Sequence, residues 1–371
     1  METTSQAQEA ALYTKENPLV TKVTDNYILN KEGSIKDTRH IAISLEASGV
    51  NYIPGDSLYI FPENDSELVK ELLNELDLDL SLEEETKRFT EEVNLTRPSS
   101  KLFKAIAEKT GEDAKEIQSS FDGYNSVNII KETKSKFPEF KITSNELAEN
   151  SSKANPRAYS IASSLKAHPE SVELCIARVE EEINGQMVFG LCSNFICNRV
   201  AVGDEKKVKV YIHKNDRFRL PEDPKTKVIM VGPGTGIAPF RAFIEERNSL
   251  RDSGTEVGAD WLFFGDQRSK FDYLYGEELE GYKEKYGLKI DLAFSRDQDF
   301  KVYVQDKMRE NSAEIFKWLE EGAHFYVCGD ARRMAKDVDQ ALKDIAAEHG
   351  KDPEEYVKAL KDEKRYSRDV Y

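Results

Sequence analysis

The feature that most constrains the fold is a glycine-rich turn between a buried strand and a helix, in the segment VIMVGPGTGIAPF. Gly232, Gly234 and Gly236 allow the backbone to turn tightly after the strand. Thr235 follows where backbone amides and a helix N-terminus would meet a pyrophosphate, so the turn predicts a dinucleotide site. Ile237 occupies the third glycine position of a GxGxxG pattern, and WLFFG is interpreted as having no acidic residue after it to hold a ribose 2′-hydroxyl, so an NAD-type site is poorly supported. An ordinary tight turn stays the alternative for this motif alone.

Strand and helix alternate from this turn onward. WLFFG, KIDLAFS and HFYVCG are typical of buried strands, whereas APFRAFIEERNSL and the amphipathic segment after HFYVCG are typical of helices. Such alternation predicts a parallel sheet with right-handed crossovers. Earlier in the chain, SVELCIARV and VKVYIH alternate with the period of a strand and predict a small antiparallel barrel or sandwich.

We therefore predict an α/β protein with an antiparallel β-barrel, built from three parts. Residues 1–66 and 151–222 form the barrel, residues 67–150 form a mostly helical and acidic insert, and residues 223–371 form the parallel-sheet domain. A chain of 371 residues is long enough for two or three domains with their own cores.

Composition and charge limit the classes of partner and the cellular location that the chain is expected to have. The formal charge of 53 − 69 = −16 disfavours nucleic acid or an anionic membrane as a partner. No basic stretch followed by an apolar run opens the chain, and no window has the roughly 18 apolar residues that span a bilayer, so a cytoplasmic location is predicted. Cys175, Cys192, Cys197 and Cys328 are too scattered for a disulfide framework, and no metal site is expected.

A second group of polar residues follows the strand KIDLAF, in SRDQDFKVYVQ. The Ser295 hydroxyl, the Arg296 guanidinium, the Lys301 ammonium and the Tyr303 phenol could converge on a dianionic 2′-phosphate, which favours NADPH over NADH. Charged residues at a strand end are more often a solvated loop. Their place one crossover after the glycine turn favours the nucleotide site.

The segment NPRAYSIASS offers groups suited to a flavin. Arg157 can neutralise a diphosphate, Tyr159 can lie against a planar ring, and Ser160 can offer a hydroxyl to a ring nitrogen. The alternation of polar and apolar residues, taken alone, would indicate only an amphipathic strand without a flavin. In GLCSNF, the amides from Gly190 and the hydroxyl of Ser193 could bind a further phosphate, with helix capping by Ser193 as the alternative.

Cys328 ends the strand HFYVCG, at the edge where open α/β sheets place their ligands. A buried structural cysteine is an equally good interpretation of this position, because reactivity would need a lowered thiol pKa.

With these segments in view, the chain resembles the reductase half of the diflavin reductases, within the ferredoxin-NADP reductase superfamily, and most of all those that serve sulfite reductase. The likeness runs from about Asn17 to Tyr371 and includes NPRAYSIASS, FRLP, VGPGTGIAPFRAF, WLFFG, FSRDQ, KVYVQDK, YVCGDARRMAKDV and RYSRDVY. It implies an FAD-binding barrel with a helical connecting insert, followed by a parallel-sheet NADP-binding domain.

The resemblance also assigns roles to residues. The positions implied for FAD are Arg97, Arg157, Ala158, Tyr159, Ser160, Cys175, Ile176, Ala177, Gly190, Leu191, Cys192, Ser193 and Tyr371. The positions implied for NADPH are Gly234, Thr235, Gly236, Ser295, Arg296, Lys301, Val302, Tyr303, Val304, Gln305 and Asp337. Those implied for hydride transfer are Ser160, Cys328 and Asp369, which would orient the nicotinamide, and Tyr371, whose ring would cover the flavin until it moves.

The partner implied is a separate redox protein, either a sulfite reductase hemoprotein or a flavodoxin that feeds it. Two departures from the family pattern stand out. Only about twenty residues precede the likeness, where relatives carry an FMN-binding domain, so FMN is expected to be absent. Glu181 also replaces a tyrosine, so one adenine or ribose contact is expected to differ.

Two other functions fit the sequence. One is a general NADPH-flavodoxin or ferredoxin reductase, unrelated to sulfur assimilation. The other is a redox-inactive scaffold that keeps the fold for partner binding. The scaffold is disfavoured because Ser160, Cys328, Asp369 and Tyr371 occur together with the flavin and nicotinamide positions.

Overall fold

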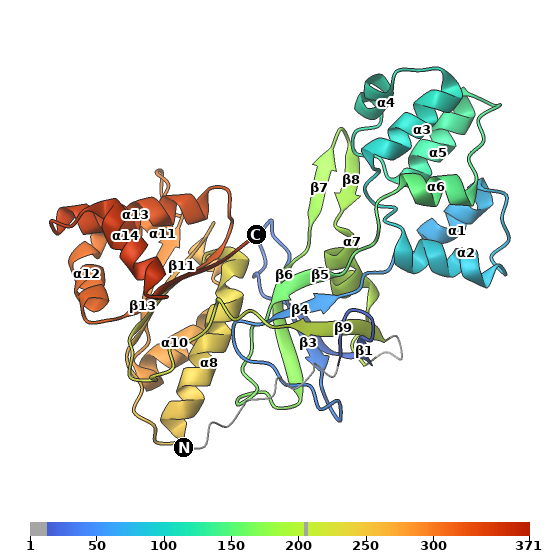
Figure 1. The fold of residues 1–371 in the computed structure, drawn as a ribbon. Helices are drawn as coiled ribbons and strands as arrows, with labels where there is room; N and C mark the ends of the chain where they lie inside the picture. Colours follow the sequence, from blue (N-terminus) through green and yellow to red (C-terminus); the bar gives the residue numbers. More distant parts are fainter. Residues whose placement is uncertain (1–12, 204–206) are drawn as a thin grey trace, which may run out of the picture. The chain divides into compact units, whose positions relative to one another are not determined.

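Two compact units make up the protein. The computed structural model, shown in Figure 1, describes residues 13–203 and 207–371. The first unit consists of the chain up to Leu58 together with Tyr159–Ala177 and Val210–Tyr371, and the second of Tyr59–Ala158 and Arg178–Lys209. The three-part division drawn from the sequence stays a prediction.

A five-stranded parallel sheet forms the centre of the first unit, in the order β12-β11-β10-β13-β14. Its strands are β10 (Val228–Val231), β11 (Asp260–Asp266), β12 (Lys289–Phe294), β13 (His324–Gly329) and β14 (Tyr366–Val370). The predicted parallel sheet is therefore confirmed. The sequence did not indicate β14, the edge strand, because YSRDV carries charged residues where a buried strand would be apolar.

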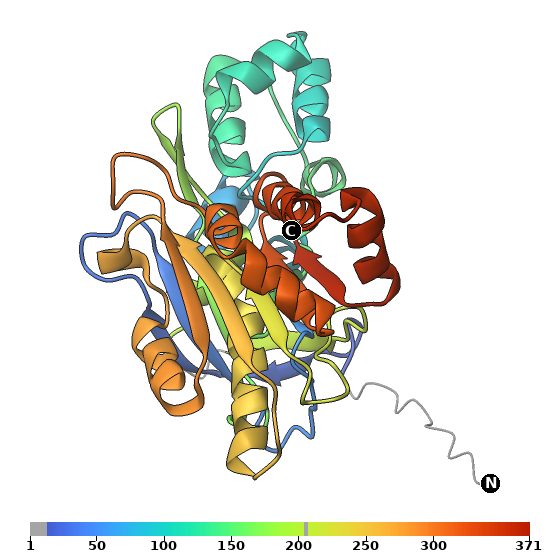
Figure 2. The ribbon, with the colours of Figure 1, turned by 90° about the vertical axis from the view of Figure 1, so that its left-hand side faces the viewer.

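Helices cover both faces of this sheet (Figure 2). They are η3 (Gly234–Ile237), α8 (Ala238–Asp252), α9 (Ser269–Asp272), α10 (Gly276–Tyr286), α11 (Val304–Glu310), α12 (Ser312–Glu320), α13 (Met334–Glu348) and α14 (Pro353–Asp362). One core cluster joins the sheet to α8 and α10, and another joins it to the helices from α11 to α14. Burial on both faces explains why VIMV and WLFFG are almost continuously apolar.

An antiparallel sheet of β2, β3 and β6 also belongs to the first unit. These strands span Val23–Ile28, Thr38–Ser44 and Ser171–Ala177. The central strand β3 pairs along its whole length with β6, and the run from Val172 to Ile176 is buried on both faces. The predicted alternation on SVELCIARV therefore understates how deeply this strand is packed.

A further sheet has the order β1-β9-β4-β5, with strands at Leu19–Thr21, Val208–His213, Ser57–Ile60 and Arg157–Ser160. The boundary between the two units passes through β4, β5 and β9. Antiparallel strands in the region predicted to bind flavin and a parallel sheet after them confirm the predicted fold class.

The second unit is mostly helical. Its elements are α1 (Ser66–Glu75), α2 (Glu83–Lys87), η1 (Arg88–Glu92), α3 (Ser100–Thr110), α4 (Ala114–Ser120), α5 (Ser126–Lys136), α6 (Ser144–Asn150), β7 (Glu180–Ile183), β8 (Gln186–Phe189), α7 (Leu191–Asn194) and η2 (Phe195–Arg199). The Asp65 side chain accepts a hydrogen bond from the amide of Glu67 and caps the start of α1. Gly111 ends α3 with a left-handed backbone. Among the helices of residues 13–203 and 207–371, none has the length and apolarity needed to cross a membrane.

Substitution of Gly236 tests how closely the glycine turn approaches β13. An alanine there would press its methyl group into the carbonyl oxygen of Cys328. We expect Gly236→Ala to lower the free energy of unfolding by about 1–3 kcal/mol, as overpacking does. Gly281→Ala in α10 is the control, because no atom lies within 4 Å of an added Cβ there. Denaturant unfolding should show a gain of about 0.5–1 kcal/mol for the control, and equal losses in both variants would contradict the close approach.

Candidate functional site

The glycine turn connects β10 directly to helical structure. Gly234 has the positive φ of 56° that favours glycine, and the turn continues through η3 into α8. Gly236 lies against the backbone of Cys328, so the ends of β10 and β13 meet here. A turn without bulky side chains, leading into a helix N-terminus, offers amide groups to an anionic ligand.

Ser160 and Asp369 form a hydrogen-bonded pair beside Cys328. Ser160 Oγ donates to Asp369 Oδ2 over 2.7 Å, and Asp369 is the register partner of Cys328 in the β13–β14 pair. Burial raises the pKa of the Asp369 carboxyl above its usual range, while the hydrogen bond from Ser160 opposes the shift. Three of the residues predicted for hydride transfer thus meet at one place in the first unit.

Cys328 is fully buried, and its thiol is held in the neutral form. Burial raises the pKa of this thiol well above its usual range, and the nearby Asp369 raises it further. A protonated thiol is a poor nucleophile, so Cys328 is suited to packing beside a ligand rather than to covalent chemistry. The structure shows Cys328 buried, and its place beside a ligand stays a prediction.

Tyr371 has a fixed backbone and an exposed ring. Its amide donates to the carbonyl of Gly329 over 3.1 Å, and its carbonyl accepts from the amide of Ala331 over 3.1 Å. The residue as a whole is 64% exposed, and its ring hydroxyl lies 2.8 Å from Thr235 Oγ1. This contact brings the end of the chain to the glycine turn, which sequence separation alone did not indicate.

Ser295 and Arg296 follow β12 and are tied to the end of β11. The Ser295 amide donates to the Asp266 carbonyl over 3.0 Å, and the Arg296 amide donates to the Gln267 carbonyl over 2.8 Å. The backbone holds this turn, and the Arg296 side chain is exposed. A fixed turn with an exposed guanidinium suits an anionic group better than an untethered loop would.

Lys301 and Tyr303 lie between that turn and α11. Lys301 is exposed, and Tyr303 is 43% exposed at the start of the helix, where its amide donates to Asp306 over 2.9 Å. Val302 packs against the core and Val304 is part of it, so they anchor this segment. Gln305 is half-buried in the first turn of α11, and the predicted Asp337 is exposed in the first turn of α13.

Asp266 directly follows WLFFG as the last residue of β11, so the prediction that no acidic residue follows this strand is wrong. In NAD-type sites an acidic residue in this region holds a ribose hydroxyl. Here the Asp266 side chain is 1% exposed and forms an ion pair with Lys36. Burial raises the pKa of the Asp266 carboxyl, and Lys36 opposes that shift.

The residues predicted for the flavin in the first unit include buried and accessible positions. Tyr159 and Ser160 are half-buried at the end of β5. Cys175 and Ile176 are buried in β6, whereas the following Ala177 is exposed. Cys175 belongs to the same core cluster as Cys328.

In the second unit, Arg157 and Ala158 are exposed in β5. At the predicted phosphate turn, the Gly190 amide donates to the Val179 carbonyl over 2.9 Å, and Ser193 Oγ accepts from the Val179 amide over 3.1 Å. No side chain caps α7, so the alternative role of Ser193 as a helix cap is wrong. A Cβ at Gly190 would lie only 2.6 Å from Ser193 Oγ, which explains the glycine.

The other members of that turn, Leu191 and Cys192, are half-buried and buried respectively. Arg97, the residue predicted near the adenine, lies elsewhere in the second unit beside Glu181, with 4.0 Å between its guanidinium and the carboxylate. Both side chains are more than half exposed. Glu181 is the residue that departs from the family pattern, so the departure places an acid next to the predicted cation.

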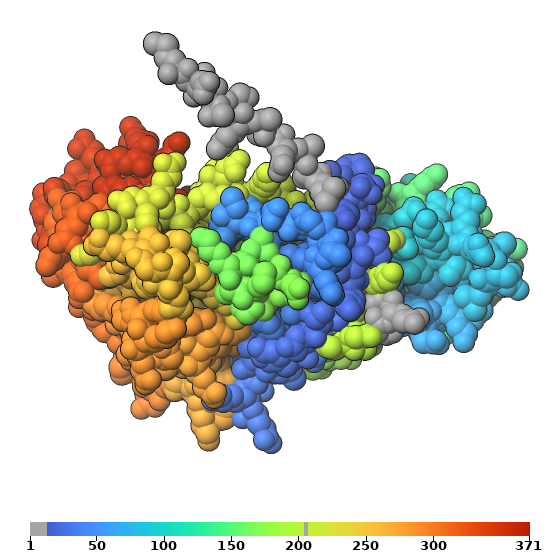
Figure 3. All heavy atoms as spheres, turned by 90° about the horizontal axis from the view of Figure 1, so that it is seen from below, coloured from blue at the N-terminus to red at the C-terminus, as the bar shows by residue number. Residues whose placement is uncertain are grey.

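A buried network that the sequence did not indicate is centred on Arg241 of α8. Its guanidinium donates to the Ala162 carbonyl over 2.7 Å and pairs with Glu173 over 2.7 Å, Glu245 over 2.9 Å and Glu278 over 2.8 Å. These contacts join the segment Tyr159–Ala177, seen as green atoms against the gold of α8 in Figure 3, to two helices of the parallel-sheet region. Complete pairing makes the buried charges tolerable.

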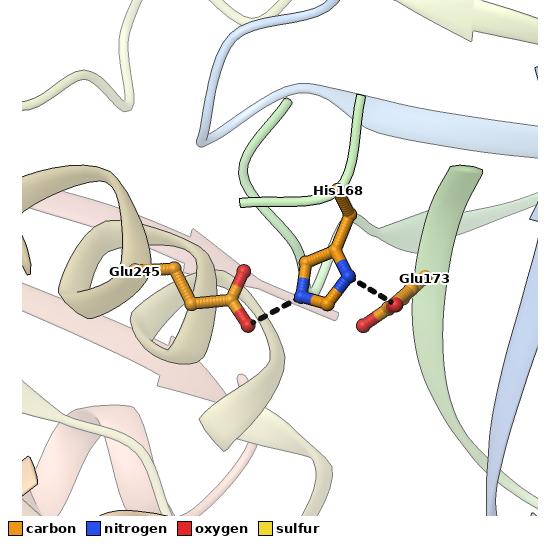
Figure 4. A group of neighbouring side chains, drawn as sticks. All are labelled: His168, Glu173 and Glu245. Carbon is orange, nitrogen blue, oxygen red and sulfur yellow. Dashed lines mark hydrogen bonds and ion pairs between the residues drawn. The ribbon is translucent and has the colours of Figure 1, made fainter. Parts of the chain in front are cut away.

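His168 lies between two carboxylates of the same network, as Figure 4 shows. Its ring nitrogens lie 2.9 Å from Glu173 and 3.1 Å from Glu245. These hydrogen bonds raise the pKa of His168 to about 10. Although His168, Glu173 and Glu245 are ligand types that metals use, Arg241 already pairs with both carboxylates, so the site has no need of a cation.

His168→Ala should lower the free energy of unfolding in a pH-dependent way. The pKa of His168 is about 10 in the folded protein and 6.5 in the unfolded chain, so its stabilisation is complete below pH 6.5 and is lost as pH rises towards 10. At pH 6 we expect a loss of about 1.5–3 kcal/mol, typical of charged hydrogen bonds. Urea unfolding of both proteins from pH 6 to 10.5 checks this, and a difference that stays constant with pH would contradict it.

Comparison with known proteins identifies two domain families. Residues 230–340 match the family described as oxidoreductase NAD-binding domain, and residues 12–124 and 87–195 match the family described as FAD binding domain. The matches support FAD and NADPH as cofactors. The glycine turn, whose backbone approach to β13 leaves no room for a Cβ, fits such a nucleotide.

Curated relatives match almost the entire chain. The sulfite reductase (NADPH) flavoprotein alpha-component of Bacillus subtilis (strain 168) is 39% identical over 395 residues, which cover 99% of this chain and 63% of that protein. The proteins of that name from Vibrio vulnificus (strain CMCP6) and Cronobacter sakazakii (strain ATCC BAA-894) are 39% and 40% identical, with 97% of this chain covered in each case. The chain spans 60% and 62% of these two relatives, so it matches less than two thirds of each of the three.

Proposed function

Since the chain belongs to the flavoproteins that combine an FAD binding domain with an oxidoreductase NAD-binding domain, we propose that it takes hydride from NADPH and passes electrons singly to a separate redox protein. The observation that carries this proposal lies at the carboxyl edge of the parallel sheet. There the glycine turn after β10, the Ser295–Arg296 turn after β12, and Cys328 with Asp369 at the ends of β13 and β14 share one edge. Ligands of open α/β sheets bind at this edge.

The nicotinamide end of the site would lie at Ser160, Cys328 and Asp369. Bound FAD and NADPH would supply the hydride and electron chemistry, while the protein orients them. The hydrogen bond from Ser160 fixes the Asp369 carboxyl, and the neutral Cys328 thiol provides a small, uncharged wall. The exposed ring of Tyr371 would have to move before a nicotinamide could reach a flavin that it covers.

The phosphate groups of NADPH would lie along the same edge. Thr235 and the amides of Gly234 and Gly236 would bind the pyrophosphate. The residues proposed around the 2′-phosphate and the adenosine are Ser295, Arg296, Lys301, Val302, Tyr303, Val304, Gln305 and Asp337. Support comes from the tethered Ser295–Arg296 turn and from the exposed side chains of Arg296, Lys301 and Tyr303.

The residues that we propose for FAD are those that the family resemblance implies. In the first unit we assign Tyr159 and Ser160 to the ring system and the segment from Cys175 to Ala177 to its surroundings. In the second unit we assign Arg157 and Ala158, the turn from Gly190 to Ser193, and the exposed Arg97. The match of residues 12–195 to FAD binding domains supports this assignment.

The electron acceptor that we propose is a sulfite reductase hemoprotein. Relatives with 39–40% identity are named as the flavoprotein component of an NADPH sulfite reductase, which supports this choice. One alternative acceptor is a flavodoxin that feeds this hemoprotein. Another is a flavodoxin or ferredoxin that has no part in sulfur assimilation. We place the reaction in the cytoplasm, since the four cysteines are buried and their scattered positions do not suit a disulfide framework.

Arg296→Ala tests the proposed 2′-phosphate site. Loss of a charge-assisted contact of about 1.5–3 kcal/mol should raise the Kd for NADPH roughly 10- to 100-fold and change that for NADH little. Titration calorimetry with both nucleotides measures the two effects. Arg309→Ala, at the opposite end of α11, is the control, because Arg309 pairs with Asp344 on the surface. Equal losses for NADPH and NADH in Arg296→Ala would show that the 2′-phosphate lies elsewhere.

An anaerobic titration tests the function as a whole. NADPH added to the FAD-loaded chain should bleach the flavin absorbance, and a sulfite reductase hemoprotein added afterwards should restore it. A parallel sample receives flavodoxin in place of the hemoprotein. If flavodoxin is the acceptor, it should restore the absorbance faster than the hemoprotein does. A chain that reconstitutes with FAD but is not bleached by NADPH would overturn the proposed reaction and favour a redox-inactive scaffold.

A further inference from the structure

Asp266 lies between the two phosphate-binding turns of the first unit. Its Oδ2 atom is 3.9 Å from where a Cβ of Gly234 would stand, in the glycine turn. Its carbonyl oxygen accepts from both the amide of Ser295, at 3.0 Å, and the Ser295 hydroxyl, at 3.3 Å. A carboxylate thus stands on the path between the pyrophosphate and the 2′-phosphate of the nucleotide proposed above.

Such a carboxylate would work against NADPH if it were left alone. Like charges within a few ångströms repel strongly in a poorly hydrated site, and Asp266 is 1% exposed. An acidic residue after the second strand of a dinucleotide fold usually accepts hydrogen bonds from the ribose hydroxyls of NAD. An unpaired Asp266 would therefore weaken the binding of NADPH and favour the binding of NADH.

Lys36 removes this difficulty. Its ammonium forms an ion pair with Asp266, and the lysine side chain is still 34% exposed. The Asp266 carboxylate also accepts from the amide of Gln267 over 2.6 Å. Both partners contact Oδ1, so the ammonium neutralises the charge of the acid, while part of the ammonium still faces the solvent.

The loop that carries Lys36 is itself fixed. It connects β2 to β3 and is held by Asp272 in α9, which accepts from Asn30 Nδ2 over 2.9 Å and from Ser34 Oγ over 2.5 Å. The Lys36 amide donates in turn to Ser34 Oγ over 3.0 Å. The amide of Lys31 also donates to the Phe271 carbonyl over 2.8 Å. Lys36 is thus delivered to Asp266 from a distant part of the chain by a tethered loop.

We propose that Lys36 is a specificity-determining residue for NADPH, which masks the Asp266 carboxylate so that the edge between the glycine turn and the Ser295–Arg296 turn accepts a 2′-phosphorylated dinucleotide. This inference rests on the proposed function and adds to it a residue from the β2–β3 loop, outside the parallel-sheet region.

The test is a double-mutant cycle on the full FAD-loaded chain, with NADP+ and NAD+ as the ligands in titration calorimetry. Lys36→Met should raise the Kd for NADP+ about tenfold or more, as for loss of a charged contact, and should leave that for NAD+ unchanged or lower it. Asp266→Asn added to Lys36→Met should restore most of the NADP+ affinity, because the buried carboxylate is then gone.

Lys31→Met is the matched control. Lys31 lies in the same loop and pairs with Glu277, with both side chains well exposed, so its loss should leave both affinities unchanged. The FAD content and the midpoint of thermal unfolding of each variant show whether it is folded.

Three outcomes would overturn the inference: an unchanged NADP+ affinity in Lys36→Met, equal losses for NADP+ and NAD+, or a loss that Asp266→Asn does not relieve. Failure of the proposed function has a different signature. A wild-type chain that contains FAD and binds no NADP+ would contradict the function, whereas a wild-type chain that binds NADP+ as tightly as Lys36→Met contradicts this inference alone.

Discussion

Parallel pairing of the five strands is the constraint on which the rest of the structure depends. In a parallel sheet all strands end at one edge, and here that edge carries the glycine turn, Asp266, Ser295, Cys328 and Asp369. A dinucleotide is long and has chemically different ends. The row of strand ends offers a dinucleotide different groups in a fixed order. The Ser295–Arg296 turn follows β12 at one end of the row, and Cys328 and Asp369 lie in β13 and β14 at the other end.

Two kinds of contact hold the parts of the first unit in place around this edge. One is backbone contact without a side chain between, as where Gly236 lies on Cys328. The other is a set of buried charges whose members come from different parts of the chain, such as Arg241 with Glu173 and Lys36 with Asp266. Buried ion pairs contribute less to stability than to a unique arrangement when every charge is compensated, and here they join the β2–β3 loop and β6 to the parallel-sheet region.

Local patterns predicted the elements of the site well. The glycine turn, the strand ends and the Ser295–Arg296 turn each follow from a short run of residues, because turn geometry and burial act over a few positions. The pairs that complete the site could not be predicted in this way. Ser160 and Asp369 are 209 residues apart, and Lys36 and Asp266 are 230 apart, so only the tertiary fold brings them together.

The same limit explains the two omissions. The edge strand β14 has a charged sequence, since one of its sides has no neighbouring strand, and hydropathy alone did not reveal it. Asp266 could have been found from its position after WLFFG, but its meaning depends on a lysine that no local pattern connects to it. The roles assigned to the flavin residues came from the family resemblance and not from spacing.

The most direct test of the account is a crystal structure of the FAD-loaded chain with NADP+ bound. It should show the 2′-phosphate at the Ser295–Arg296 turn, the pyrophosphate on the glycine turn, and the nicotinamide beside Cys328 and Asp369 with Tyr371 displaced. A nucleotide bound away from the carboxyl edge of the parallel sheet, or with its 2′-phosphate remote from Ser295, would contradict the account.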